Sequence, residues 1–438
     1  MTIQLSKAPK KYIIVYMIMV YLIYVFGSLN WPKVHFILLT IFYAAVLFAI
    51  KAGYDYGYSL KIKKRPSIYL STKHINLLLI LGVVNLYPML MIIFAEEHLS
   101  LNVILYKILL ATQGLGDAYY ERGMNILEVS IFSNKWLLFN FLYNPFAIFV
   151  TYNCMLHFKS LNLFQKFLII FIVLVELGAY IAVGTNKLIF DYLLIIVTCI
   201  LLNNRSNGNK MKMSFFSKRT FVISLLIVGA LVFFGSSFSS RMERKDSSHM
   251  VYNSISGTMI NQEQIGLLPE TMQEAVLGFE SYLTQGLHHL DKALGMDFQW
   301  CYGLGASNYF TMFVGHFGIS DKIIKNRTYE ERMSNDEGVT NGMYWYSFYV
   351  AYANDITFFL VPLLIFVLSV MWGHYYKACL ETDDMLCFPI FALLLICFFY
   401  LNANNQIFGK AQLLAFVPLY IASKFVSVKC KALSLKVA

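Results

Sequence analysis

Ten apolar segments, each close to the length of a membrane-crossing helix, constrain what this chain of 438 residues can fold into. About 20 apolar residues make one helical crossing of a bilayer. Because 58% of the residues are hydrophobic and only 14% are charged, one water-soluble core cannot enclose all these segments. The sequence therefore predicts an all-α polytopic membrane protein with roughly ten or more transmembrane helices. The predicted spans are residues 12–28, 34–50, 75–95, 136–156, 163–183, 188–202, 221–238, 356–372, 385–401 and 413–426.

One long polar stretch, residues 237–345, interrupts this succession of apolar segments. It divides the chain into an N-terminal transmembrane bundle of about seven spans at 1–236, a large loop, and about three C-terminal spans at 346–438. Since this loop is the one long polar stretch in the chain, we expect it to carry most of the functional groups.

Basic residues gather in the connections after the second and the sixth predicted span, which we therefore expect to be cytoplasmic. Counting spans from there also places both chain ends in the cytoplasm and the 237–345 loop outside. The loop has the reverse balance, with eight Lys and Arg against thirteen Asp and Glu. Topology and attraction to anionic membrane lipid thus account for the net charge of +10, and no nucleic-acid partner is expected. The basic residues of these two connections and of the two chain ends are Lys7, Lys10, Lys11, Lys51, Lys61, Lys63, Lys64, Arg65, Lys73, Arg205, Lys210, Lys212, Lys218, Arg219, Lys424, Lys429, Lys431 and Lys436.

The loop contains a predicted amphipathic helix. Apolar residues recur at steps of three and four from Met272 to Leu294, after Pro269 and before Gly295, which are typical of a helix start and end. Such a stripe must bury against something, so we expect an ordered lid that lies on the membrane domain or its interface.

A row of polar residues runs beside the apolar stripe. It comprises Glu280, Thr284, His288 and Asp291, and it is either a solvated helix face or part of a site. The glycines that follow the helix, among them Gly303 and Gly305, are interpreted as turns, because a nucleotide-binding loop would need a preceding strand.

Ionisable residues at the mouth of a membrane span are costly and are therefore candidates for function. Glu176 lies near the outer end of the fifth predicted span, and Asp355 lies at the outer mouth of the eighth, behind a belt of aromatic residues. Lys187 and Asp191 begin the sixth span four residues apart, so they either neutralise each other or take part in chemistry.

Four arginines flank the membrane on the predicted outer side, Arg241 and Arg244 after the seventh span and Arg327 and Arg332 before the eighth. They either hold lipid phosphate or bind a substrate. Guanidinium groups bind phosphate oxygens bidentately and stay charged, so they suit an enzyme that acts on a sugar-bearing lipid diphosphate. A carboxylate or imidazole could accept the proton of an attacking hydroxyl. A lipid diphosphate is already activated, so we expect neither a cofactor nor a metal.

Three stretches resemble the O-antigen polymerases of the Wzy type, which assemble bacterial surface polysaccharides. The first is Ser281-Tyr-Leu-Thr-Gln-Gly286 followed by Trp300-Cys-Tyr-Gly-Leu-Gly-Ala-Ser307. The second is Arg327-Thr-Tyr with Trp345 and Ala353-Asn-Asp-Ile-Thr357, and the third is Gly184-Thr-Asn-Lys-Leu, where lysine replaces a more usual arginine. Arg327 and Gly338 also match the arginine, ten residues, glycine spacing of such loops.

The resemblance implies a glycosyltransferase of GT-C-like architecture in the bacterial inner membrane, active at the periplasmic face. It would transfer a growing glycan from undecaprenyl diphosphate onto a new lipid-linked repeat unit, with a chain-length regulator and a flippase as further partners. The implied site residues are Arg241, Arg244, Arg327, Arg332 and Glu280 for substrate binding, His288 or Asp355 for the acceptor hydroxyl, and Lys187 for the leaving group.

Two alternative functions remain open. An O-antigen ligase would use the same donor but pass the glycan to a lipid A core. A flippase or transporter belongs to another class, which is commonly built from internal repeats. The chain shows no convincing repeat, and one large loop breaks any symmetry, so the polymerase is preferred.

Overall fold

The computed structural model describes residues 2–4, 8–96, 98–115, 118, 135–185, 187–203, 210–212, 229, 235, 258–307, 320–336, 346–403, 405 and 412–430. This part of the chain is mostly helical, as predicted, and five of its helices are long and apolar enough to cross a membrane. The five are α1 (Ala8–Phe26), α2 (Phe36–Ser59), α3 (Thr72–Phe94), α7 (Leu163–Ala182) and α16 (Phe348–Glu381).

The other predicted spans form helices of several lengths, except 221–238, most of which lies outside the described residues. The helices of 13 and 14 residues near the C-terminus extend about 20 Å, less than the roughly 30 Å of a bilayer's hydrocarbon core. Ten full-length spans therefore stay a prediction, as does the GT-C-like architecture. The remaining helices of the N-terminal and C-terminal parts are α4 (Leu101–Gln113), α6 (Lys135–Leu156), the short 3-10 helix Phe158–Ser160, α8 (Lys187–Asn203), α17 (Cys387–Phe399) and α18 (Gln412–Phe425).

Helices α2 and α16 pack side by side through glycines. A Cβ atom on Gly57 of α2 would overlap the carbonyl oxygen of Val370, and one on Gly373 of α16 would overlap that of Tyr54. Small residues that let two backbones approach closely are typical of paired membrane helices. At Thr357 the backbone of α16 leaves helical geometry, with φ 66° and ψ 156°, so the predicted span 356–372 begins at a kink.

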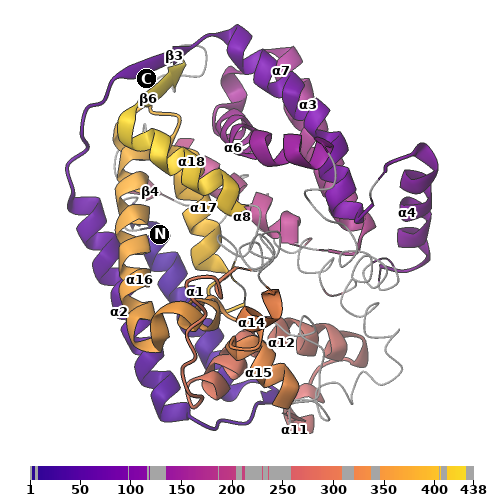
Figure 1. Cartoon of the computed structure of the whole chain (residues 1–438), viewed down its shortest axis with the longest axis vertical. Coiled ribbons are helices and arrows are strands. Elements are labelled where there is room, and N and C mark those ends of the chain that lie inside the picture. The colour runs from indigo at the N-terminus through magenta and orange to yellow at the C-terminus, as the bar shows by residue number, and fades with distance from the viewer. Residues whose placement is uncertain are drawn as a thin grey trace.

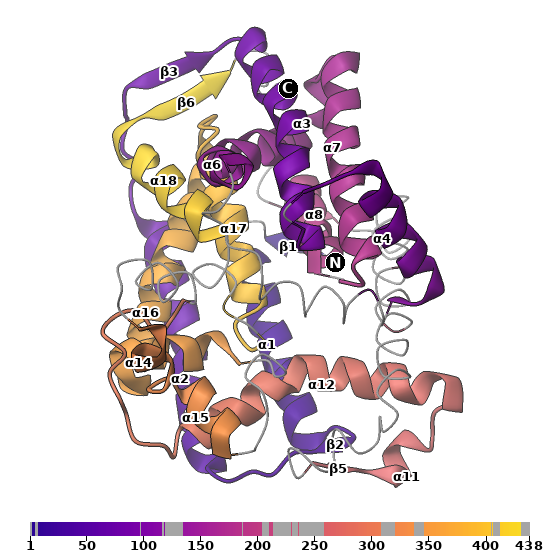
Figure 2. The same cartoon turned by 45° about the vertical axis from the view of Figure 1, so that its right-hand side comes forward.

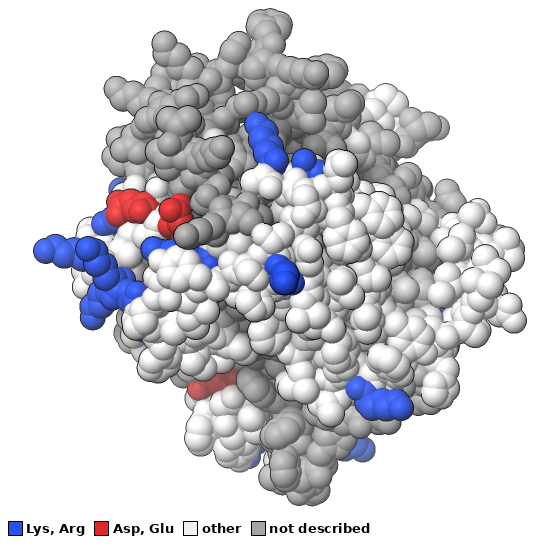
Figure 3. Space-filling model, turned by 90° about the horizontal axis from the view of Figure 1, so that it is seen from above, with Lys and Arg blue, Asp and Glu red and all other residues white. Residues whose placement is uncertain are grey.

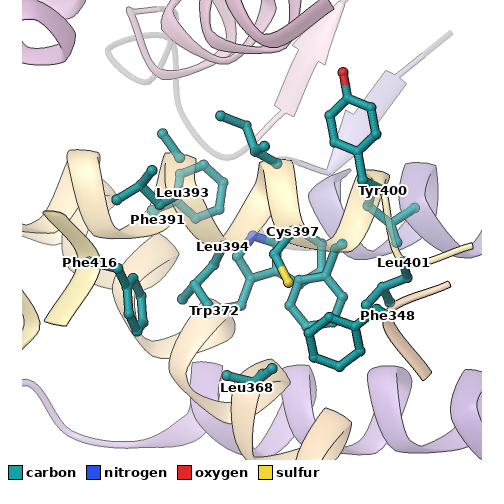
Figure 4. Close-up of a cluster of buried hydrophobic side chains, with 14 of the residues drawn as sticks. Phe348, Leu368, Trp372, Phe391, Leu393, Leu394, Cys397, Tyr400, Leu401 and Phe416 are labelled. Carbon is teal, nitrogen blue, oxygen red and sulfur yellow. The ribbon is translucent and has the colours of Figure 1, made fainter. Parts of the chain in front are cut away.

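Helix α17 lies inside the bundle, and nearly all its residues are buried. Its Phe398 ring stacks on Trp372 of α16 with 4.7 Å between the ring centroids. Figure 4 shows this cluster of buried side chains, from which Tyr400 points away. Because neighbouring helices enclose α17, its apolar composition is explained by protein packing as well as by contact with lipid.

Three short strand pairs connect segments that are far apart in the sequence. The parallel pair β3·β6 lies at one end of the molecule, and the antiparallel pair β2·β5 lies at the other (Figures 1 and 2). Each pair, β1·β4 included, joins two connections for which the basic residues predict the same side of the membrane. Figure 3 looks onto the β3·β6 end, where Lys and Arg are more widely spread than Asp and Glu. The sidedness itself stays a prediction. The strands are β1 (Thr2–Gln4), β2 (Leu29–Asn30), β3 (Ser67–Leu70), β4 (Lys210–Lys212), β5 (Met259–Ile260) and β6 (Ser427–Cys430).

The predicted amphipathic helix of the loop is confirmed as α12 (Glu270–Ala293), with Pro269 at its N-cap. It lies across the end of α1, at the end of the molecule opposite β3·β6 (Figure 2). Leu287 and Leu290 of its apolar stripe are fully buried. The helix is therefore an ordered lid on the bundle. The other loop helices are α11 (Gln262–Ile265), α14 (Asp321–Lys325) and α15 (Tyr329–Asp336).

Candidate functional site

The polar row of α12 is not a solvated helix face, so that interpretation is wrong. Thr284, His288 and Asp291 have no exposed surface, and Glu280 is 5% exposed. The indole Nε1 of Trp31 donates a hydrogen bond of 2.8 Å to Thr284 Oγ1, and the same indole stacks on the His288 ring at 4.7 Å. The row packs against the connection between α1 and α2.

Asp291 caps the start of α2. Its carboxylate accepts the backbone N–H groups of Val34 (2.7 Å) and His35 (3.1 Å), immediately before the helix begins at Phe36. The first N–H groups of a helix lack partners within it, and a negative charge there is favourable. Asp291 thus holds the α1–α2 connection, which α12 covers.

His288 was predicted to assist the acceptor hydroxyl, but it has no exposed surface with which to contact a substrate. Burial lowers the pKa of His288, and the neighbouring charges of His289 and Lys292 lower it further. Stacking on Trp31 gives the His288 ring a packing role, and its assistance to the acceptor hydroxyl stays a prediction.

Glu280 lies against the backbone of the α1–α2 connection, where a Cβ atom on Gly27 would overlap its carboxylate. Burial raises the pKa of Glu280, while the N–H groups of Leu29 and Ser28 act in the opposite direction. The residue also lines a cavity of about 380 Å³ together with Phe26 and other mainly apolar residues. Its contact with a substrate stays a prediction.

Lys187 forms the predicted ion pair with Asp191 at the start of α8. The preceding turn uses Gly184 with φ 65°, and the Lys187 ammonium lies 5.8 Å from the centroid of the Tyr400 ring. Nearby, the Tyr192 hydroxyl donates to the Glu176 carboxylate. The predicted neutralisation of Lys187 by Asp191 is therefore confirmed. Assistance of Lys187 to a leaving group stays a prediction.

Arg327 and Arg332 keep most of their hydrogen-bonding capacity. The Arg327 guanidinium donates to the carbonyl oxygen of Trp300 (3.2 Å) and lies 4.8 Å from the centroid of the Tyr302 ring. Arg332 likewise donates to the Asp297 carbonyl (2.9 Å) and lies over the ring of Tyr329. Both are half-buried, and neither has a carboxylate within 4 Å in the described chain. Since a guanidinium has five donors, both remain able to bind an anion.

The other two predicted arginines, Arg241 and Arg244, lie outside the described residues.

Asp355 holds a backbone turn. Its two carboxylate oxygens accept the N–H groups of Gly305 (3.1 Å) and Ala306 (2.9 Å). A Cβ atom on Gly305 would lie 2.7 Å from the Cβ atoms of both Asn354 and Cys301, so only glycine fits there. The prediction that the glycines form turns is confirmed. Asp355, predicted to assist the acceptor hydroxyl, is therefore placed as a positioning residue.

Glu330 is an acid that the sequence analysis did not single out. Asn354 Nδ2 donates to its carboxylate at 2.8 Å, and Asn354 Oδ1 accepts the N–H of Tyr329. Burial raises the pKa of Glu330, and Asp355 raises it further, whereas Asn354 and Arg332 lower it. The available signal was its position between two arginines in a short polar segment.

The four charged groups surround one buried thiol. Burial raises the pKa of Cys301 to about 12; the charges of Asp355 and Glu330 raise it, and those of Arg327 and Arg332 oppose them. Two acids and two arginines therefore act on the same point: Glu330 and Arg332 of α15, Asp355 of α16, and Arg327 in the connection between α14 and α15. We call these four residues the α15–α16 charge cluster.

A short segment, residues 400–405, connects the cluster with the Lys187 turn. The Tyr400 hydroxyl donates to the Lys187 carbonyl (3.5 Å), and Asn405 Nδ2 donates to the carbonyl of Ala306 (2.8 Å). Five residues extend at most about 17 Å, so both turns lie within reach of one substrate-sized region. The segment is uncharged, so its composition did not mark it as part of a site; its three asparagines were the available signal.

No family model, no curated protein and no solved structure matches the chain. The family resemblance therefore stays a prediction, and the candidate site depends on its own geometry.

Proposed function

We propose that the chain is a membrane glycosyltransferase that polymerises undecaprenyl-diphosphate-linked repeat units into O-antigen or a related surface polysaccharide. The observation that carries this proposal is the α15–α16 charge cluster, in which two half-exposed arginines without carboxylate partners in the described chain flank a carboxylate of raised pKa. The expected location is the periplasmic face of the bacterial inner membrane.

Arg327 and Arg332 would bind the diphosphate of the donor. Each guanidinium is oriented by one carbonyl oxygen and one aromatic face, which leaves its other N–H groups for phosphate oxygens. As the bond between the anomeric carbon and the diphosphate oxygen breaks, the electron pair stays with the diphosphate. Donors that are already in position stabilise this developing charge without reorganisation.

Glu330 would accept the proton of the acceptor hydroxyl, whose oxygen forms the new bond to the anomeric carbon. A raised pKa makes a carboxylate a better proton acceptor near neutral pH. Asn354 and Asp355 would act as positioning residues, since they hold α15 and the 303–306 turn to the start of α16.

The experiment is the glycolipid profile of a deletion strain, combined with reconstitution of the purified protein. We expect lipid A core capped by single repeat units in the strain, and extension of lipid-linked repeat units by the purified protein alone. Bare core with accumulated lipid-linked polymer would identify a ligase instead. Loss of all periplasmic repeat units, without extension in vitro, would identify a flippase.

A further inference from the structure

Two large aromatic side chains stand exposed beside Arg327. Trp300 is 52% exposed and Tyr302 is 46% exposed, and their ring centroids lie 5.2 Å apart at an interplanar angle of 54°. The two rings therefore form an open corner. Arg327 adjoins the corner, because its guanidinium lies over the Tyr302 ring, 4.8 Å from the ring centroid.

The two rings belong to a turn whose backbone is held by the neighbouring structure. Cys301, between the two aromatic residues, is fully buried and donates its N–H to the Asn354 carbonyl (3.1 Å). Tyr302 has φ 60°, a left-handed conformation that is unfavourable for a residue with a bulky side chain. Backbone strain of this kind persists where the surrounding structure enforces it, and it gathers at functional sites.

Single exposed apolar residues are common and need no explanation. Here two rings share one strained, anchored turn, and one of them, Tyr302, contacts a cation of the candidate site. The negative face of an aromatic ring attracts polarised C–H bonds, such as those on one face of a pyranose sugar. Asp297 and Gln299, both exposed on the same turn, add groups that can bind sugar hydroxyls.

We infer that Trp300 and Tyr302 form a platform that binds a pyranose ring of the glycan next to the diphosphate at Arg327. The identity of the glycan as a lipid-linked repeat unit rests on the proposed function. The platform itself predicts affinity for the sugar without lipid or phosphate.

The test uses the full-length protein in nanodiscs and the oligosaccharide that mild acid releases from the host's lipid-linked repeat unit. We expect Trp300→Ala and Tyr302→Gly to weaken its binding about tenfold or more in ligand-observed NMR titrations. Tyr302→Gly removes the ring but relieves the left-handed strain, so its melting temperature should not fall. A matched control is Trp136→Ala, which removes half of another exposed Trp–Tyr pair, with Tyr87 at 5.3 Å.

Unchanged oligosaccharide binding in both platform variants would overturn the inference, even if the deletion strain lacks polymer. Conversely, binding that depends on Trp300 in a protein without polymerase activity would reject the proposed function and keep the platform. Quenching of tryptophan fluorescence in nanodiscs with brominated lipid tests the alternative that Trp300 is inserted in the membrane. If replacing Trp300 by Phe removed most of the lipid-dependent quenching, the ring would be a membrane anchor and the inference would be wrong.

Discussion

The polar row of α12 and the α15–α16 charge cluster look alike in the sequence, yet the structure uses them differently. Both place ionisable side chains outside the predicted spans. In α12, Asp291 and His288 are buried. Asp291 accepts two backbone N–H groups of the α1–α2 connection, and the His288 ring stacks on Trp31 of the same connection. In the cluster, the described partners of Arg327 and Arg332 are carbonyl oxygens and tyrosine side chains, and both arginines remain half-exposed. The distinguishing property is thus whether neighbouring segments enclose the side chain or leave it at the surface.

Variants of the cluster arginines and variants of the α12 row should therefore have different effects. Substitutions of Arg327 or Arg332 should reduce activity and leave folding intact, because their remaining N–H donors do not hold the chain together. Changes in the α12 row should reduce folding and leave the activity of each folded molecule intact. A variant that behaves in the opposite way would break the comparison.

The largest effect is expected for Arg327→Ala. Loss of a preorganised donor to the leaving diphosphate should remove roughly 3 kcal/mol of transition-state stabilisation, about a hundredfold or more in rate. Arg327→Lys should recover part of this loss, since it restores the charge but not the planar fork. The measurement is the initial rate of chain extension by reconstituted protein, with membrane insertion level as the control. Lys322→Ala, on exposed α14, is the matched variant, and equal rates for it and Arg327→Ala would remove Arg327 from the site.

Glu330→Gln should be the next largest, with a loss of about a hundredfold at neutral pH if Glu330 is the general base. A carboxylate accepts a proton only when it is ionised, and the pKa of Glu330 is raised by burial. The rate of the unaltered protein should therefore fall, as pH drops, at a pH above the value of about 4.3 for a free glutamate. An acid limb that persists unchanged in the residual activity of Glu330→Gln would assign the base to another residue.

Asp291→Ala should affect folding instead. The two backbone N–H groups that it accepts before α2 would lose their partner, at a cost of about 1–2 kcal/mol. We expect a lower melting temperature and less inserted protein, while the rate per folded molecule stays the same. The control is Asp336→Ala, which alters an exposed acid at the end of α15. A fall in the rate per folded molecule would show that α12 contributes to the reaction directly.

What could be predicted from the sequence is what neighbouring residues determine. Apolar runs locate the membrane helices, the three-and-four spacing locates α12, and the i,i+4 spacing gives the Lys187–Asp191 pair. The solvated-face alternative for the α12 row failed because the burial of the row depends on Trp31, which is 253 residues away from Thr284 in the chain. Periodicity shows that two faces of a helix differ, but not which distant segment covers the polar one.

The candidate site was predictable to a similar extent. Composition identifies Arg327, Arg332 and Asp355 as charged residues beside a span. It does not reveal that Asp355 binds the N–H groups of a turn 50 residues earlier, or that Asn405 reaches the same turn. These contacts are long-range and use backbone groups, which every residue carries, so no residue type marks them in advance.

The smallest expected effect is a pH dependence of stability that belongs to the α12 row and not to the charge cluster. Burial lowers the pKa of His288, so below about 6.5 the unfolded chain binds a proton that the folded chain does not. Stability should therefore fall as pH decreases through 6.5, by at most about 1.4 kcal/mol per pH unit from this group. His288→Phe keeps a ring to stack on Trp31 and removes the proton, so its melting temperature should depend less on pH between 7 and 5. The acid limb of the reaction rate should stay in place in the same variant, because it belongs to Glu330. If both pH dependences moved together, the α12 row and the charge cluster would form one coupled site, and the division between enclosed and surface side chains would not hold.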